Sequence, residues 1–340
     1  MRRAAVLAVD GGGSKVDAVL VARDGTILAA ARVPNPDDGT DPYGYLDGVE
    51  AGVTEVARHA GMDPGHRPLA ALGMYCLAGA DLPSDDRRIL RWISKQGWTT
   101  EDVLRNDTFA VLRAGTDRTW GVGVVCGFGT NCSGVAPNGR TYRLPAVGPI
   151  SGDWGGATDV GGTALWHALR ARDGRGPRTA LATLVPAHFG MRRPHQVMEA
   201  MYFGRMVEGR LAELAPLVFQ AAAEGDAVAL GIVERQADEV ATMATAAIRR
   251  LGMTRLDVPV VLGGGIFRNP FAAFFGRIAD GVHRVCPAAS ITVLQAPPAV
   301  GAALLGLDRV GATDAAKRRV RAALTHARLA VEARRRRPRG

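Results

Sequence analysis

The feature that most constrains this 340-residue chain is a unit of three short strand-like runs that occurs twice. In the first copy, "AAVLAVD" leads into the glycine turn "GGGSK", and "VDAVLVARDGTILAAARV" supplies two more runs separated by Asp24-Gly25. In the second copy, "WGVGVVCGFGTNCSGVAPNGRTYRLP" contains a run, a glycine turn at residues 127–131, a run, an Asn138-Gly139 turn and a third run. The two glycine turns lie 116 positions apart. This self-similarity indicates a duplicated domain with an antiparallel meander in each half, although glycine turns also recur by chance in hairpins.

Both glycine turns have the composition of phosphate-binding loops, because glycine lets backbone N–H groups converge on an anion. The first turn lacks the G-x-x-x-x-G-K-[ST] spacing of nucleotide-binding P-loops. No helix follows it, whereas the dinucleotide fingerprint requires one. Two hairpin turns therefore predict one phosphate loop per half, with ordinary turns that bind no ligand as the alternative.

The rest of the chain alternates between helical and strand-like patterns. Helical spacing is predicted at residues 46–62, 85–97 and 108–115, with buried or short strands at 68–80 and 101–107. The second half is mostly helical, at residues 178–190, 195–204, 209–225 and 226–252. A last motif, "VPVVLGGGIFRNP", predicts a strand, three glycines and a helix that begins near Asn269-Pro270, where proline suits a first helical turn.

Composition restricts the class of protein. The apolar fraction of 47% supports large cores, and no run of 18 apolar residues indicates a membrane span. The N-terminal arginines lead straight into a strand, so we expect no signal peptide. The four cysteines form no C-x-x-C pair, which favours a reducing cytoplasm over a disulfide framework or a zinc site.

The formal charge of +9 is confined to the C-terminus. Residues 317–340 contain ten Lys or Arg and a single acid, Glu332, so residues 1–316 are neutral. The ending "EARRRRPRG" is typical of a solvated, disordered tail, with polyanion binding as the alternative. We therefore expect neither nucleic acid nor a membrane as a partner.

Five motifs, in order, resemble the actin-like ATP-binding proteins (sugar kinases, Hsp70 and actin), and within them the branch of N-acetylglucosamine kinases and BadF/BadG-type ATPases. They are "VDGGGSK", "RNDTFA", "GFGTN", "GDWGG" and "VLGGGIFRN". The resemblance implies an α/β, duplicated actin-like ATPase (ribonuclease H-like) fold, with two lobes around a nucleotide cleft. The expected parts are an N-terminal lobe at residues 1–117, a C-terminal lobe at 118–312, and a C-terminal helix with a basic tail at 313–340.

The resemblance also implies ATP and Mg²⁺ as cofactors and assigns residues to them. Asp10 is implied to hold Mg²⁺ through water, which suits a hard, well-hydrated cation, although a turn-capping aspartate is the alternative. The implied nucleotide contacts are Gly11, Gly12, Gly13, Ser14 and Lys15 in the first loop, Gly127, Gly129, Thr130 and Asn131 in the second, and Gly263, Gly264, Gly265 and Asn269 at the adenosine edge.

Asp107 is the implied catalytic base, which accepts the proton of the attacking sugar hydroxyl. It follows an apolar strand and precedes a helix, so a purely structural helix cap is the alternative. The implied sugar contacts are Asn35, Gly79, Asp153 and Trp154. Asn35 lies between two prolines and would equally suit a turn. Trp154 stands where many N-acetylglucosamine kinases have a glutamate, so it either stacks on a sugar ring or packs in the core, and Asp159 follows it in a helix.

By this resemblance, the chain is expected to be a cytoplasmic, homodimeric kinase that phosphorylates an amino sugar, at the 6-hydroxyl, with N-acetylglucosamine or glucosamine as examples. One alternative is an ATPase activator of the BadF/BadG type, whose cysteines bind an iron–sulfur cluster across a dimer. The other is a non-catalytic sugar sensor, which should lack the base.

Overall fold

A computed structural model describes residues 4–35 and 43–334, with side chains as far as residue 330. Clustering by contact divides the chain into two compact units. Of the described residues, unit 1 comprises 4–35, 43–123, 133–145 and 292–334, and unit 2 comprises 124–132 and 146–291.

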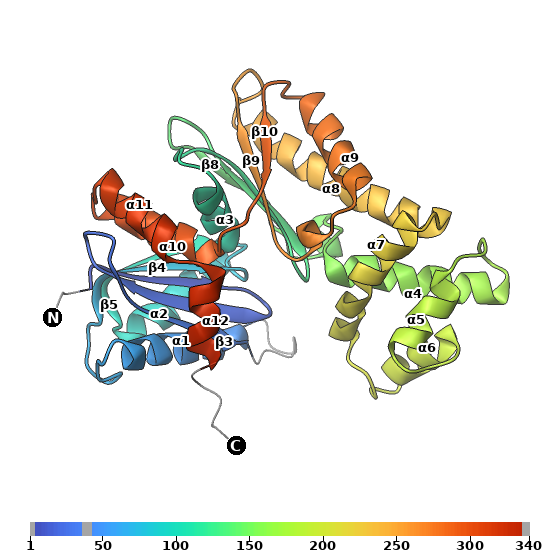
Figure 1. Ribbon diagram of the computed structural model, residues 1–340, viewed down its shortest axis with the longest axis horizontal. Coiled ribbons are helices and arrows are strands. Elements are labelled where there is room, and N and C mark those ends of the chain that lie inside the picture. The colour runs from blue at the N-terminus through green and yellow to red at the C-terminus, as the bar shows by residue number, and fades with distance from the viewer. Residues whose placement is uncertain (1–3, 36–42, 335–340) are drawn as a thin grey trace. The chain divides into compact units, whose positions relative to one another are not determined.

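Unit 1 is built on a five-stranded sheet in the order β3-β2-β1-β4-β5 (Figure 1). β1 pairs antiparallel with β2, and β2 with β3, whereas β1, β4 and β5 are parallel. The carboxyl ends of these three strands therefore meet at one edge of the sheet. The strands are β1 Val6–Gly11, β2 Lys15–Val21, β3 Ile27–Pro34, β4 Ala70–Leu77 and β5 Thr99–Asn106.

Alternating apolar residues give this sheet two buried faces. Leu7 and Val9 of β1 belong to the core under α1 and α2, and Val6 and Ala8 belong to the core under α3 and α10. In Figure 1, α1 and α2 lie on one side of the sheet and α10 and α11 on the other. The helices are α1 Tyr45–His59, α2 Pro83–Gln96, α3 Asp107–Gly115, α10 Pro298–Arg309, α11 Asp314–Ala323 and α12 His326–Arg334.

The second sheet has the order β10-β9-β6-β7-β8. Read from the other end, it repeats the first sheet, with three consecutive strands followed by two later ones. The duplication expected from the two strand–turn–strand units is therefore confirmed. The strands are β6 Gly121–Cys126, β7 Thr130–Val135, β8 Thr141–Arg143, β9 Pro259–Gly263 and β10 Ser290–Val293.

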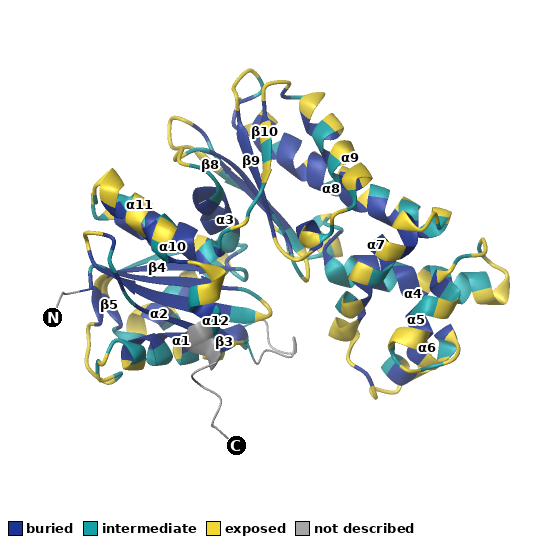
Figure 2. Ribbon diagram, in the orientation of Figure 1, coloured by how far each residue is buried: buried dark blue, intermediate teal, exposed yellow. Residues whose placement is uncertain are grey.

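The remaining helices belong to unit 2, as the helical second half predicted. Figure 2 shows their exposed faces in yellow and the buried strands in dark blue. The α-helices are α4 Ala157–Asp173, α5 Leu181–His188, α6 Pro194–Tyr202, α7 Ala215–Ala223, α8 Ala227–Arg250 and α9 Ala272–His283, and the short 3-10 helices are η1 Pro149–Ser151, η2 Glu208–Leu214 and η3 Ile266–Arg268.

The compact units do not coincide with the expected lobes 1–117, 118–312 and 313–340. Helix α10 was expected in the C-terminal lobe, but it packs in unit 1, where Ala299, Val300 and Leu304 fill an apolar face of the first sheet. Leu329 of α12 is also fully buried there. The expected C-terminal helix is thus two helices, α11 and α12, and the last six residues of the basic tail lie outside the described part of the chain.

In the described part of the chain, no single helix has both the length and the apolar composition needed to cross a membrane. Residues Glu208–Ala223 and Ala227–Arg250 meet both requirements only as a pair, which is bent by 115°.

Candidate active site

Three charged side chains lie in a row across the first sheet, beside the first glycine turn. Asp10 on β1 pairs in register with Asp17 on β2, and Asp17 pairs with Arg32 on β3. Arg32 Nε and Nη2 donate to the two Asp17 oxygens at 2.6 and 2.8 Å, and Lys15 Nζ lies 2.6 Å from Asp17 Oδ2. Burial favours a raised pKa for Asp17, but the Arg32 hydrogen bonds and the Lys15 charge outweigh it and lower the pKa. Asp17 is therefore ionised, and it forms an ion pair with Lys15.

Asp10 lies near the end of β1 and is only 6% exposed. Burial raises the pKa of Asp10 to about 6, against the opposing charge of Lys15, whose Nζ lies 3.8 Å from Asp10 Oδ2. Mg²⁺ commonly binds one or two carboxylates together with substrate phosphates and water. A buried carboxylate at the base of a phosphate loop fits that donor set. Among the described residues, no group of three or more His, Cys, Asp and Glu side chains could hold a metal by itself.

Asp107 is the first residue of α3, directly after β5. The residue that caps this helix is Asn106, whose Oδ1 accepts a hydrogen bond from Thr108 N at 3.1 Å. Asn106 is thus the N-cap residue of α3. Burial raises the pKa of Asp107 to about 7, and the negative charge of Asp10 adds to the rise. A carboxylate with a pKa near 7 is suited to proton transfer at neutral pH.

Asn35 forms two hydrogen bonds with the first phosphate loop, residues 11–15. Asn35 Nδ2 donates to Gly12 O at 2.9 Å, and Asn35 N donates to Ser14 O at 3.1 Å. Gly13 and Ser14 are exposed at the tip. A Cβ at Gly12 would meet no protein atom within 4 Å, so packing does not require glycine at this position. The structure thus gives Asn35, an expected sugar contact, a role in shaping the loop.

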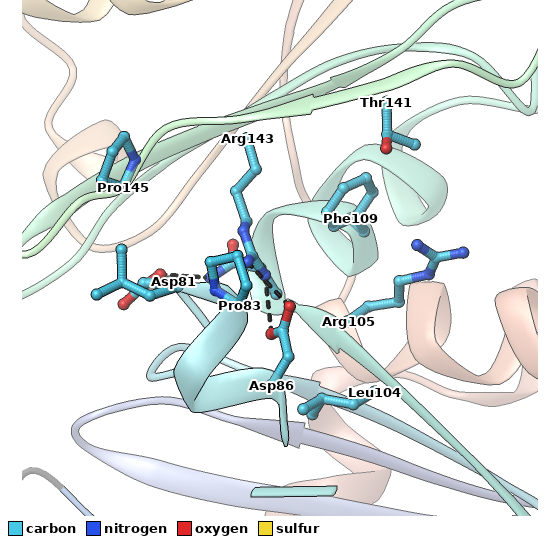
Figure 3. A pocket seen from close by; sticks show the side chains of 11 residues that line it. Asp81, Pro83, Asp86, Leu104, Arg105, Phe109, Thr141, Arg143 and Pro145 are labelled. Atoms are coloured by element: carbon cyan, nitrogen blue, oxygen red, sulfur yellow. Dashed lines mark hydrogen bonds and ion pairs between the residues drawn. The ribbon is translucent and has the colours of Figure 1, made fainter. Parts of the chain in front are cut away.

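A pocket of about 380 Å³ lies beside Asn106 in unit 1 (Figure 3). Asn106 Nδ2 donates to Asp81 Oδ1 at 2.9 Å, and Arg143 forms an ion pair with Asp86 and donates to Ala80 O. These contacts fix residues 78–81, which include the expected sugar contact Gly79. A Cβ at Gly79 would press on the Tyr45 ring, so packing explains this glycine without a ligand. The pocket is further lined by Leu82, Pro83, Leu104, Arg105, Phe109, Thr141 and Pro145.

The second phosphate loop, residues 127–131, joins β6 to β7 in unit 2. Gly127 N donates to Gly129 O at 2.9 Å, which closes the turn. Added Cβ atoms at Gly127 and Gly129 would meet no protein atom within 4 Å, as at Gly12. Thr130 Oγ1 lies 3.1 Å from Cys126 Sγ, and Asn131 Oδ1 accepts from Cys132 N at 2.6 Å. Packing within the protein therefore does not require glycine at positions 12, 127 and 129.

Residues 152–156, here called the acceptor loop, contain the expected sugar contacts Asp153 and Trp154. Asp153 Oδ2 accepts from Ser151 Oγ at 2.5 Å. The Trp154 ring is covered by the guanidinium of Arg235, with Cζ 3.9 Å from the ring centroid. Asp159 on α4 accepts from Gly155 N at 2.8 Å, so its carboxylate fixes the end of the loop. Trp154 therefore stacks on an arginine of α8.

The third glycine motif, residues 263–265, follows β9 as expected. Gly264 has a φ of +111°, and a side chain there would strike the carbonyl of Cys126. Asn269 Oδ1 accepts from Phe271 N at 3.0 Å, and α9 begins at Ala272. Asn269 thus shapes the turn into this helix, whose start lies three residues beyond the predicted position.

Unit 1 brings together Asp10, Lys15, Asn35 and the first phosphate loop, with Asp107 close enough for Asp10 to raise its pKa. Unit 2 brings together the second phosphate loop, the acceptor loop and Gly264. Sequence reasoning missed Asp17, Arg32, Asn106 and Gln236. Asp17 and Gln236 could have been found from the sequence, because each is a polar residue at a position where the spacing of the apolar residues predicts burial.

The four cysteines are all buried and free. Cys126 and Cys132 flank the second phosphate loop, and burial raises the pKa of the Cys126 thiol to about 12. A neutral, buried thiol is a packing group and a weak hydrogen-bond partner.

The duplicated sheets, with a glycine turn in the first hairpin of each, define an ATP-binding fold of the actin-like sugar kinase class. A crystal structure of a protein described as an N-acetylglucosamine kinase from Chromobacterium violaceum matches with a TM-score of 0.68 and 25% identity, over 90% of this chain and 99% of the other. The chain belongs to the BadF/BadG/BcrA/BcrD ATPase family, whose model matches residues 7–306.

Two curated relatives cover most of the chain. The N-acetyl-D-glucosamine kinase of Dictyostelium discoideum is 25% identical over 91% of this chain and 99% of its own length. The N-acetylmuramic acid/N-acetylglucosamine kinase of Clostridium acetobutylicum is 26% identical over 78% of this chain and 86% of its own. The expected family and fold are thereby confirmed.

Proposed function

We propose that this protein is an ATP-dependent kinase that transfers the γ-phosphate to the 6-hydroxyl of an amino sugar such as N-acetylglucosamine or glucosamine. The observation that carries the proposal is the position of Asp107 directly after β5, at the sheet edge where the parallel strand β1 ends with Asp10 and Gly11. The raised pKa of Asp107, about 7, is in keeping with a base at this position. The amino-sugar kinase activity of both curated relatives supports the same class of acceptor.

In this proposal, Asp107 accepts the proton of the attacking hydroxyl. The sugar oxygen forms a bond to the γ-phosphorus while the bond to the bridging oxygen of ADP breaks, and ADP leaves. Backbone N–H groups at Gly13 and Gly129 bind phosphate oxygens, and Lys15 supplies positive charge. Mg²⁺, when held by Asp10, neutralises charge on the phosphates. Asn35, Gly79, Asp153 and Trp154 orient the sugar, and Gly264, Gly265 and Asn269 contact the adenosine.

The family resemblance also supports a homodimer acting in the cytoplasm. Light scattering after size exclusion should return twice the mass of one chain, and a monomer mass would contradict this part of the proposal.

An ADP-release screen over amino sugars and neutral hexoses tests the activity. We expect release with Mg-ATP that depends on an amino sugar and is far lower with neutral hexoses. Asp107→Asn serves as the matched inactive variant, because it keeps the side-chain shape. Sugar-independent ADP release in both proteins would contradict the kinase assignment.

A further inference from the structure

Gln236 is a fully buried amide on α8, a helix whose inward positions are otherwise almost all apolar. Its Oε1 accepts a hydrogen bond from Gly156 N at 2.8 Å. Its Nε2 lies 3.7 Å from Cys126 Sγ as a donor. The backbone N–H of Gly156 can only donate, so it fixes which end of the amide is oxygen. Buried polar side chains in folded proteins are normally hydrogen-bonded, as both ends of the Gln236 amide are.

The partners of Gln236 lie in one predicted ligand-binding segment and next to another. Gly156 ends the acceptor loop, and Cys126 immediately precedes the second phosphate loop. Cys126 Sγ also lies 3.1 Å from Thr130 Oγ1, so a continuous chain of contacts runs from Gly156 through Gln236 and Cys126 to Thr130.

The second phosphate loop is also hydrogen-bonded to the first turn of α4, which directly follows the acceptor loop. Ala157 N donates to Gly127 O at 2.8 Å, and Thr158 N donates to Phe128 O at 3.0 Å. Gly156 has a φ of +84°, and a Cβ there would strike the carbonyl of Gly129. A Cβ at Gly155 would lie 2.9 Å from Gln236 Nε2. The acceptor loop therefore has no space for a side chain at Gly155 or Gly156, where it packs against Gln236 and the second phosphate loop.

We propose that Gln236 is a positioning residue that locks the acceptor loop onto the second phosphate loop, so that the two segments order as one body when either binds its ligand. The kinetic part of this inference rests on the proposed kinase function, and the structural part does not. Arg235, the preceding residue, holds the Trp154 ring from the same helix, so α8 fixes the acceptor loop at two successive positions.

Hydrogen exchange of the two loops tests the lock without requiring activity. Gln236→Leu removes both hydrogen bonds and keeps a side chain of similar size. Gln236→Met is a second variant, used if Gln236→Leu folds poorly, because its flexible side chain can fill the same space. Thr245→Val is the matched control, because Thr245 is a buried polar residue of α8 that hydrogen-bonds only within the helix.

We expect amides 156–158 to exchange at least about tenfold faster in the Gln236 variants, while exchange within α8 and in Thr245→Val stays as in the parent. The probe ligand is Mg-AMP-PNP. In the parent it should slow exchange in both loops, and in the Gln236 variants only at residues 127–131. Unchanged exchange at 156–158, or faster exchange spread evenly over unit 2, would overturn the lock.

Turnover supplies the second readout. With N-acetylglucosamine as the probe, the KM values for sugar and ATP should rise together in the Gln236 variants and stay unchanged in Thr245→Val. A loss of active protein with both KM values unchanged would show a merely structural role and overturn the inference. If the parent turned over no sugar while the exchange result held, the proposed function would fail and the lock would stand.

Discussion

Asp17 and Arg32 form a two-point ion pair on neighbouring strands, with hydrogen bonds of 2.6 and 2.8 Å and a fully buried Asp17 side chain. The pair contacts Lys15, whose Nζ lies 2.6 Å from Asp17 Oδ2 and 3.8 Å from Asp10 Oδ2. It therefore fixes the position of Lys15, the one lysine among residues 11–15.

Replacing Arg32 with methionine leaves the buried Asp17 carboxylate with Lys15 alone. Breaking a buried pair in this way typically costs about 3–5 kcal/mol. The folded state lowers the pKa of Asp17, so the pair stabilises the fold above the unfolded pKa and the contribution fades as the pH falls below about 4. Urea unfolding should show that Arg32→Met has a much lower free energy of unfolding than the parent at pH 7, and that this difference is smaller at pH 3.5. Arg319→Met, which removes an exposed pair with Asp24, should cost less than about 1 kcal/mol.

Asp107→Asn should lower kcat by about 10²–10⁴-fold, because the amide cannot accept the hydroxyl proton. Mg-ATP should still bind, since Asp107 lies outside both phosphate loops. Asn106→Ala should instead lose about 0.5–2 kcal/mol of stability, because Asn106 is the cap of α3. Steady-state kinetics and thermal unfolding of the two variants separate these roles. Near-normal turnover of Asp107→Asn would exclude Asp107 as the base.

The pH dependence follows from the raised pKa of Asp107. If its ionised form is the base, kcat/KM should rise with pH and level off above about 7. Asp107→Asn should lack this limb. A limb that persisted unchanged in the variant would assign the titration to another group.

The same raised pKa affects stability in the opposite direction. The folded state binds the Asp107 proton more tightly than the unfolded state, so this group destabilises the fold as the pH rises from about 4 towards 7. Asp107→Asn should therefore melt higher than the parent at pH 8, with no such gain at pH 4. A lower melting temperature at pH 8 would contradict the burial of this charge.

Gly12→Val should leave the melting temperature of the free protein nearly unchanged, because an added Cβ meets no protein atom. It should abolish the stabilisation by Mg-ATP, which for the parent amounts to about 2.7 kcal/mol at 100 times Kd. Gly264→Val is the contrasting variant, since it strikes Cys126 O and should destabilise the protein without ligand. An undiminished Mg-ATP shift in Gly12→Val would remove the first loop from the nucleotide site.

The sequence by itself determined the repeated strand units, the glycine turns and most helices, because these depend on local periodicity and on turn chemistry. Apolar runs such as residues 4–9 identified the strands, and the predicted duplication matches the order of the two sheets. The choice between a catalytic base and a helix cap for Asp107 stayed open, since aspartate caps helices well.

Only the tertiary structure decided which distant segments meet. The four-residue strand β10 is too short to have a periodic signal, and helix α10 joins unit 1 because its small residues pack on α3 and β1. The pairing of Asp17 with Arg32 depends on strand register, and the use of Gln236 depends on a loop 80 residues earlier. Contacts of this range are set by how whole elements pack against one another, which a local pattern of residue types does not encode.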